Sequence, residues 1–181
     1  MRVITGLAKG RKLLAPEGEN TRPTSDMAKE GIFSIIQFEL AEATVLDLFA
    51  GSGQLGIEAL SRGARHCVFV DQSRQAQEII RQNLQNTGLS AQSRVAAMDY
   101  GSYLDGCKDR FDIVLMDPPY QKGLAQDALL RVAEKMKDTG VIVCETEKNE
   151  VLPEQAGEFQ LFREYRYGKA KVTVYRKKDE E

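Results

Sequence analysis

Several residue types that build metal centres and crosslinks are scarce in this 181-residue sequence. There is no tryptophan, and the one histidine, His66, lies inside an apolar run, so we assign it no catalytic part. The cysteines Cys67, Cys107 and Cys144 do not have the spacing of metal ligands. Two of them lie in apolar runs, which is typical of buried thiols in a reducing compartment. The sequence therefore favours neither a metal centre nor a structural disulfide.

Long apolar runs are also missing, since none approaches the ~20 residues that a membrane-spanning helix needs. Residues 1–6 lack the extended apolar region and cleavage site of a secretory signal peptide. We therefore expect a cytoplasmic protein without a membrane partner. The formal net charge of -2 argues neither for nor against a nucleic-acid partner. At this length we expect a single domain, residues 1–181, and a monomer.

Apolar segments alternate with segments of helical periodicity along most of the chain. Strands are predicted to begin at Thr44, Arg65, Ser93, Phe111 and Val141. Amphipathic helices are predicted before the first strand (stripe Ile32, Phe33, Ile36 and Leu40), up to Gly63, over 73–86, and from Leu124 through Met136 to a stop at Gly140. Segments 159–167 and 171–175 predict an antiparallel hairpin. This order predicts a doubly wound, mostly parallel sheet with an antiparallel edge, and a core domain over 24–176.

A glycine-rich turn follows the first predicted strand. Gly51-Ser52-Gly53-Gln54-Leu55-Gly56 has the G-x-G-x-x-G pattern between a strand and a helix, which lets backbone approach a ligand closely. Asp71 ends the next strand, where its carboxylate is placed to accept hydrogen bonds from ribose hydroxyls. Asp71 is alternatively only a cap of the following helix. These features alone fit NAD as well as S-adenosylmethionine.

Further carboxylates discriminate between the two cofactors. Asp47 lies just before the turn, where it would repel a pyrophosphate but attract a cationic aminoacyl group. Asp99 ends the third predicted strand and suits an adenine amino group, although a single acid at a strand end is common. A crevice lined by Asp47, Asp71 and Asp99 favours a sulfonium cofactor over an anionic dinucleotide. Arg22 is placed near a possible cofactor carboxylate, or is a surface arginine.

The strand that begins at Phe111 stops abruptly at Asp117-Pro118-Pro119-Tyr120. Two adjacent prolines cannot donate backbone hydrogen bonds, so the sheet ladder must end there. A carboxylate, free carbonyl groups and an aromatic ring at that point can grip a planar ligand that carries an amine. The alternative is a structural loop with an Asp-Pro turn.

The first sixteen residues predict a small β-hairpin that carries Arg2, Lys9, Arg11 and Lys12, with no acid before Glu17. Such a concentration of positive charge suits contacts to RNA phosphates. It is also what a solvated edge hairpin uses to prevent edge-to-edge pairing. A second, smaller basic surface is expected near the C-terminal hairpin, at Arg163, Arg166, Lys169 and Lys171.

The combination of these motifs resembles the class I S-adenosylmethionine-dependent methyltransferases. Asp-Pro-Pro-Tyr is typical of the branch that methylates exocyclic amines of adenine or guanine. More closely, the chain resembles the RsmD family of bacterial 16S rRNA guanine-N2 methyltransferases. The matching segments are Arg2-Val3-Ile4-Thr5-Gly6, Gly10-Arg11-Lys12-Leu13, Arg22-Pro23-Thr24-Ser25-Asp26, Lys29-Glu30-Gly31-Ile32-Phe33 and Asp47 through Gly63. Gln54, where a small residue is expected, and Ala8, where a bulkier one is frequent, depart from the family.

The resemblance implies a Rossmann-like, seven-stranded fold and S-adenosylmethionine as cofactor. It implies transfer of a methyl group to guanine N2 in 16S rRNA, within a partly or fully assembled small ribosomal subunit, and no metal. It places Asp117, Pro118, Pro119 and Tyr120 at the catalytic site. The implied cofactor residues are Asp47, Phe49, Ala50, Gly51, Ser52, Gly53, Asp71, Gln72, Asp99, Tyr100, Arg22 and Thr24.

Three other functions remain open from the sequence. An adenine-N6 methyltransferase needs the same Asp-Pro-Pro-Tyr segment to hold an amine. An NAD-dependent oxidoreductase would use the glycine-rich turn but leaves Asp47 and residues 117–120 unexplained. An RNA-binding assembly factor on an inactive methyltransferase fold would not need the complete set of acids.

Overall fold

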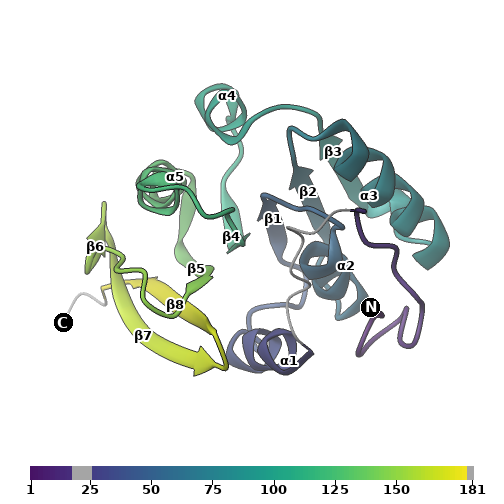
Figure 1. The fold of residues 1–181 in the computed structure, drawn as a ribbon, viewed down its shortest axis with the longest axis horizontal. Helices are drawn as coiled ribbons and strands as arrows, with labels where there is room; N and C mark the ends of the chain where they lie inside the picture. Colours follow the sequence, from purple (N-terminus) through teal and green to yellow (C-terminus); the bar gives the residue numbers. More distant parts are fainter. Residues whose placement is uncertain (18–25, 179–181) are drawn as a thin grey trace.

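An eight-stranded sheet crosses the described part of the chain, residues 1–17 and 26–178, in the computed structural model (Figure 1). The strand order is β3-β2-β1-β4-β5-β8-β7-β6. The parallel strands are β1 (Thr44–Leu48), β2 (His66–Val70), β3 (Ser93–Ala96), β4 (Phe111–Met116) and β5 (Met136–Glu147). The antiparallel edge consists of β6 (Gln155–Ala156), β7 (Phe159–Tyr167) and β8 (Ala170–Lys177).

Helices cover both faces of this sheet (Figure 1). They are α1 (Asp26–Ile35), α2 (Gln54–Ser61), α3 (Arg74–Thr87), α4 (Tyr100–Gly106) and α5 (Leu124–Ala133), with a short 3-10 turn, η1 (Ser90–Gln92). One buried cluster packs α1, α2 and α3 on the sheet, and the other packs α4 and α5 on the opposite face. The predicted doubly wound sheet with an antiparallel edge is therefore confirmed. Among the described residues, no helix is long and apolar enough to cross a membrane.

The central strands are apolar on both sides because each face meets a helical layer. In β4, Ile113 and Leu115 belong to the cluster under α1–α3, whereas Val114 and Met116 belong to the cluster under α4 and α5. This alternation explains why the sequence shows a continuous apolar run at β4. β4 ends at Met116, so Asp117 lies at the carboxyl end of the parallel strands.

Two expectations about the sheet were wrong. The sheet has eight strands rather than seven, because two residues of β6 pair with the start of β7. A pair this short has no alternation that a sequence pattern can show. Met136 was assigned to a helix, but α5 ends at Ala133 and Met136 opens β5 opposite Phe111. Its helical spacing from Val132 was misleading, because the second core buries both side chains.

The region after β3 also differs from the expectation. The strand ends at Ala96 rather than at Asp99, and an unexpected helix, α4, follows. The Asp99 carboxylate accepts hydrogen bonds from the backbone N–H and the hydroxyl of Ser102, at 2.9 and 2.8 Å. This is the geometry of a helix N-cap, so Asp99 begins α4 instead of ending β3.

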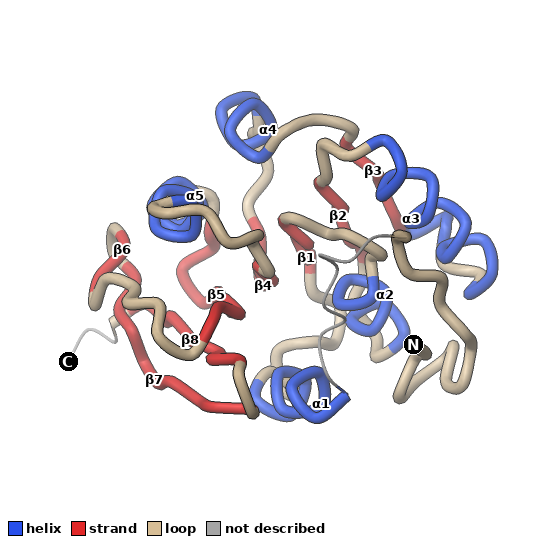
Figure 2. The backbone as a smooth tube through the Cα atoms, viewed as in Figure 1, coloured by secondary structure: helices blue, strands red, loops and turns tan. Residues whose placement is uncertain are grey.

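The N-terminal arm, residues 1–17, folds back on itself as the expected small hairpin, with one antiparallel bridge, Arg2 with Lys12 (Figure 2). The N–H of Val3 donates to the carbonyl oxygen of Arg11 at 2.9 Å, and the N–H of Leu13 donates to that of Met1 at 2.8 Å.

Side chains of α2 and α3 accept hydrogen bonds from further backbone N–H groups of the arm. Glu58 accepts from the N–H groups of Ile4 and Thr5, at 2.8 and 3.1 Å. Ser61 Oγ and Asn83 Oδ1 accept from the N–H groups of Ala8 and Leu14, at 2.9 and 2.8 Å. The arm is therefore attached to α2 and α3 along its length.

A buried ion pair lies beneath the arm. Glu58 is fully buried, with Lys29 Nζ at 3.4 Å and Arg62 Nε at 2.9 Å. Lys29 also donates to the carbonyl oxygen of Arg2 at 3.1 Å. Burial lowers the pKa of Lys29, and the neighbouring Glu58 carboxylate opposes this effect. The two charges are tolerated because nearly every polar atom of the pair has a partner.

Gly56, the last glycine of the turn pattern, is required by packing. A Cβ atom there would lie 2.4 Å from Phe69 Cε1 and 2.7 Å from Cys67 Sγ. We predict that Gly56→Ala lowers the free energy of unfolding by about 1–3 kcal/mol, measured by urea denaturation, because a buried neighbour must move. Gly106→Ala in α4 is the control, since its Cβ would meet nothing within 4 Å. Equal effects of the two substitutions would contradict this packing account.

Candidate functional site

Three adjacent parallel strands end together, and their carboxyl ends form one side of the sheet. β2, β1 and β4 are neighbours, and their last residues are aligned in register. The residues that follow them, Asp71, Phe49 and Asp117, therefore leave the sheet side by side. The carboxyl edge of a parallel sheet, where loops diverge, is the usual position of a ligand crevice. The structure thus brings together the glycine-rich turn and the Asp117–Tyr120 segment.

The turn between β1 and α2 uses left-handed backbone at three positions. The φ angles are 62° at Phe49, 59° at Gly51 and 80° at Gly53. A left-handed conformation is uncommon for a residue with a side chain, and such strain concentrates at functional sites. A Cβ atom at Gly51 would meet nothing within 4 Å, so the space beside the turn is open. The turn therefore presents bare backbone toward open space.

Two carboxylates hold this turn in place. Asp71 accepts hydrogen bonds from the N–H of Gly51 through Oδ2 and from the N–H of Ser73 through Oδ1, both at 2.9 Å. Asp47 Oδ2 accepts from the N–H of Gly56 at 2.9 Å. Both predicted cofactor acids thus also have a structural role. Asp47 lies beneath the turn, only 1% exposed, rather than on an open rim.

The electrostatics of Asp47 show how close the acids lie. Burial raises the pKa of Asp47 well above its usual value, and the N–H of Gly56 opposes the change. The negative charges of Asp117 and Asp71 raise this pKa further. Asp117 also contributes to the raised pKa of Cys144, after burial of that thiol. Asp47, Asp71 and Asp117 therefore lie close together at this end of the strands.

Asp99 and Tyr100 stand at the beginning of α4. Asp99 is exposed, and its two hydrogen bonds from Ser102 lower its pKa. The Tyr100 hydroxyl donates to Asp127 Oδ2 at 2.7 Å, and this bond is the main cause of its raised pKa. The Tyr100 ring lies 5.2 Å from the Phe49 ring, centroid to centroid. Phe49 and Tyr100 thus form an aromatic pair beside the turn.

The segment after β4 combines buried and exposed residues. Asp117 is partly buried and Pro118 is buried, whereas Pro119 is exposed. The Tyr120 side chain is 51% exposed, which leaves an aromatic surface available for stacking. A carboxylate and a carbonyl group therefore lie at the sheet edge, with an exposed ring three residues further along.

The remaining predicted cofactor residues fall into three groups. Ala50 and Ser52 are buried within the turn. Gln72 is exposed, directly after Asp71. Arg22 and Thr24 lie outside the described residues. Gln54, the departure from the family pattern, is the first residue of α2 and is also buried.

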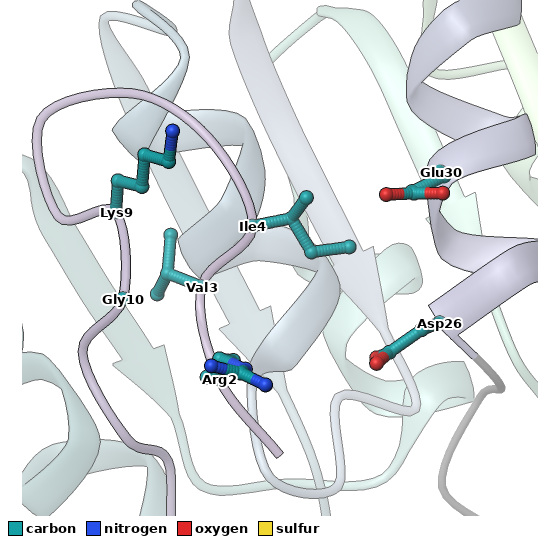
Figure 3. Close-up of a pocket in the computed structure, with 7 residues that line it drawn as sticks. All are labelled: Arg2, Val3, Ile4, Lys9, Gly10, Asp26 and Glu30. Carbon is teal, nitrogen blue, oxygen red and sulfur yellow. The ribbon is translucent and has the colours of Figure 1, made fainter.

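The four basic residues predicted to contact RNA, Arg2, Lys9, Arg11 and Lys12, are all exposed on the arm. Arg2 and Lys9 line a hollow of about 290 Å³ between the arm and α1 (Figure 3). The same hollow contains Asp26 and Glu30, and the Arg2 side chain lies across from Asp26. The charge on this side of the arm is therefore mixed.

The second basic surface is smaller than expected. Lys171 is only 4% exposed; its ammonium group donates to the carbonyl oxygen of Glu150 and lies 3.7 Å from Glu164. Lys171 is thus a structural residue of β8, and its inclusion in the surface was wrong. Strand alternation gave no warning, because the loop that supplies Glu150 lies 21 residues earlier in the chain.

Sequence reasoning missed Asn83. This amide is fully buried in α3 and bonds both the N-terminal arm and the carbonyl oxygen of Ser52 in the glycine-rich turn. Helical periodicity places Asn83 beside Ile80 and Leu84 on the apolar stripe of α3, whereas Asn86 falls off the stripe and is exposed. That local signal indicates burial of Asn83 but not what its amide binds.

Known proteins match the chain over nearly all of its length. The sequence model of a family described as "Conserved hypothetical protein 95" matches residues 1–176. "Putative rRNA methyltransferase YlbH" of Bacillus subtilis is 40% identical, over 98% of this chain and 100% of that protein. "Ribosomal RNA small subunit methyltransferase D" of Escherichia coli is 31% identical, over 98% and 90% of the two chains. The solved structure "Putative methyltransferase yhhF from Escherichia coli" has a TM-score of 0.86 at 30% identity, with 99% of each chain covered.

The buried Asp47 carboxyl should make stability depend on pH. Its pKa is 3.8 in an unfolded chain and well above that in the folded protein, so the folded state holds the proton more tightly. The resulting stabilisation is present at acid pH and is lost as pH rises from about 3.8 to the folded pKa. We predict that the unfolding free energy of Asp47→Asn, minus that of the wild type, increases across this window and then levels off. The increase is about 1.4 kcal/mol for each pH unit between the two pKa values.

Urea titrations at several pH values measure this difference. Asp99→Asn is the control, because the pKa of Asp99 is lowered in the folded protein and the trend has the opposite sign. Any stability that the substituted amide at position 47 loses through altered hydrogen bonding does not depend on pH, so it shifts the difference in unfolding free energy by the same amount at every pH. A difference for Asp47→Asn that does not change with pH would refute this account.

Proposed function

This chain belongs to the Conserved hypothetical protein 95 family, and we propose that it is an S-adenosylmethionine-dependent methyltransferase that modifies ribosomal RNA. The resemblance to the RsmD family is confirmed by the match over residues 1–176 and by the two curated relatives. The observation that carries the proposal is the position of Asp117–Tyr120 beside the glycine-rich turn at one sheet edge. A methyl donor and a target amine can meet only if their binding segments are neighbours.

The residues of the turn fit this cofactor. The bare backbone at Gly51 admits a close ligand, and Asp71 and Gln72 are placed for the ribose hydroxyls. The rings of Phe49 and Tyr100 offer an apolar wall for the adenine. The charges of Asp71 and Asp117, close to Asp47, attract the cationic aminoacyl end and repel a pyrophosphate. The same charges therefore disfavour NAD.

The Asp117–Tyr120 segment would hold the target base. When bound, S-adenosylmethionine supplies the electrophilic methyl group. Asp117 and the carbonyl oxygen of Pro118 accept the two hydrogens of an exocyclic amine, which orients its nitrogen and helps the lone pair to localise. Tyr120 stacks on the base that has been turned out of its helix. No strong base is required, because proton loss is easy once the nitrogen carries positive charge.

Guanine N2 of 16S rRNA is the target that we propose, on the strength of the family. The carboxylate and carbonyl of residues 117 and 118 suit adenine N6 equally, so the site defines an amine rather than one base. The exposed basic residues of the arm supply the RNA contact, and their small number suggests that ribosomal proteins help to position the enzyme. We propose that the substrate is a partly or fully assembled small subunit, and that the enzyme acts as a cytoplasmic monomer.

Mass spectrometry of nucleosides tests the target. Small-subunit particles are incubated with the wild-type protein and labelled S-adenosylmethionine, and the RNA is then digested. Labelled N2-methylguanosine supports the proposal, whereas N6-methyladenosine would identify the adenine alternative. Absence of turnover would favour an inactive assembly factor. The methylation rate of protein-free 16S rRNA is measured in parallel. Equal rates on RNA and on particles would count against an assembled subunit as the required substrate.

Asp117 should be essential for transfer but not for cofactor binding. We predict that Asp117→Ala lowers kcat by about 100-fold or more, because the amine loses an oriented acceptor. Asp117→Asn keeps one acceptor oxygen and should lose less. Calorimetry with S-adenosylhomocysteine checks that the cofactor site survives in both variants. Wild-type turnover in Asp117→Ala would remove the role assigned to this carboxylate.

The arm should contribute to RNA binding through charge. We predict that Lys12→Gln weakens binding to small-subunit particles and lowers the steepness of log K against log salt by about 0.9, as for one lost phosphate contact. Lys108→Gln is the matched control, because Lys108 is also exposed but precedes β4 at the opposite edge of the sheet. Fluorescence anisotropy across a salt series measures both slopes. Identical slopes for the two variants would exclude Lys12 as a phosphate contact.

A further inference from the structure

Asn83 joins two segments that the proposed function uses separately. Its Oδ1 accepts from the N–H of Leu14 at 2.8 Å, and its Nδ2 donates to the carbonyl oxygen of Leu14 at 2.9 Å. The same Nδ2 donates to the carbonyl oxygen of Ser52, also at 2.9 Å. Leu14 belongs to the N-terminal arm and Ser52 to the glycine-rich turn. One fully buried amide thus binds the backbone of both.

The arm touches the turn at a second point. Ser52 Oγ lies 3.7 Å from Met1 Sδ, and the N–H of Leu13 donates to the carbonyl oxygen of Met1 at 2.8 Å. The bridge between Arg2 and Lys12 lies directly beside these contacts. Two of the basic residues proposed to contact RNA therefore neighbour the residues that are attached to the turn. Movement of the arm and movement of the turn are mechanically linked.

We propose that Asn83 is a positioning residue that fixes the N-terminal arm relative to the glycine-rich turn, so that RNA and cofactor bind with positive coupling. The inference rests on the proposed function. A ligand that orders the turn also restricts the arm, so the arm loses less conformational entropy when it binds RNA. The coupling is reciprocal, so RNA must raise the affinity for cofactor by the same factor.

Substitutions at position 83 test the coupling. Asn83→Asp keeps the acceptor for Leu14 but loses both donated hydrogen bonds, and Asn83→Leu loses all three. Asn86→Asp and Asn86→Leu are matched controls, because Asn86 is the same residue type, in the same helix, but exposed. Leu14→Pro removes the N–H donor from the arm without altering α3. Because Leu14 is 44% exposed, this variant keeps the test available if substitutions at position 83 prevent folding.

The measured quantity is the dissociation constant of S-adenosylhomocysteine with and without saturating small-subunit particles. We expect a ratio of about 5 or more in the wild type and in the Asn86 variants. It should approach 1 in the Asn83 variants and in Leu14→Pro, although each still binds S-adenosylhomocysteine alone. A merely structural role would lower the melting temperature but leave this ratio unchanged.

Two outcomes would overturn the inference. One is a wild-type ratio near 1, and the other is a wild-type ratio that persists in the Asn83 variants and in Leu14→Pro. Either result leaves the proposed function intact as long as the wild type methylates small-subunit RNA. Failure of that methylation would instead refute the proposed function itself.

Discussion

The hydrogen bond from the N–H of Gly56 to the buried carboxylate of Asp47 is the interaction on which the site depends. It joins the end of β1 to the first turn of α2 and so defines the path of the glycine-rich turn between them. The arrangement is costly, because burial and two neighbouring acids all oppose ionisation of Asp47. A neutral residue would avoid this cost. Such a cluster of acids suits a cationic ligand, which also favours ionisation of Asp47, and it therefore favours a sulfonium cofactor.

The position of α2, which the bond between Asp47 and Gly56 helps to define, also determines where the N-terminal arm lies. Once α2 is in place, Glu58 and Ser61 face the arm and take its backbone N–H groups. Asn83 of α3 completes the attachment and reaches back to the turn. Val3, Ala8 and Leu13 of the arm are buried in the same core cluster, so its position is decided by apolar packing together with these buried polar partners. The glycine-rich turn and the arm are consequently supported by one helical layer.

Much of the fold followed from patterns within short segments. The apolar strands, the amphipathic helices and the stop of α3 at Gly88 were all predicted, because burial on both faces or on one stripe leaves a periodic signal. Two of the errors come from competition between local signals. Met136 continued a helical stripe but joined β5, and Asp99 looked like the end of a strand but caps α4. Pairing with the distant Phe111 decided the first case, and the local hydrogen bonds from Ser102 decided the second.

The sequence by itself determined the chemistry of the site. The carboxylates at the ends of β1, β2 and β4, the glycine pattern and Asp117–Tyr120 can be recognised because each stands at a predicted strand end, where a sequence pattern is enough to locate it. Only the tertiary structure decided what the buried polar residues bind. The apolar stripe of α3 indicates that Asn83 is buried and Asn86 is not, but it does not indicate the partners of the buried amide. The reason is that the partners of Asn83 come from Leu14 and Ser52, 69 and 31 residues away, and no local pattern encodes such contacts.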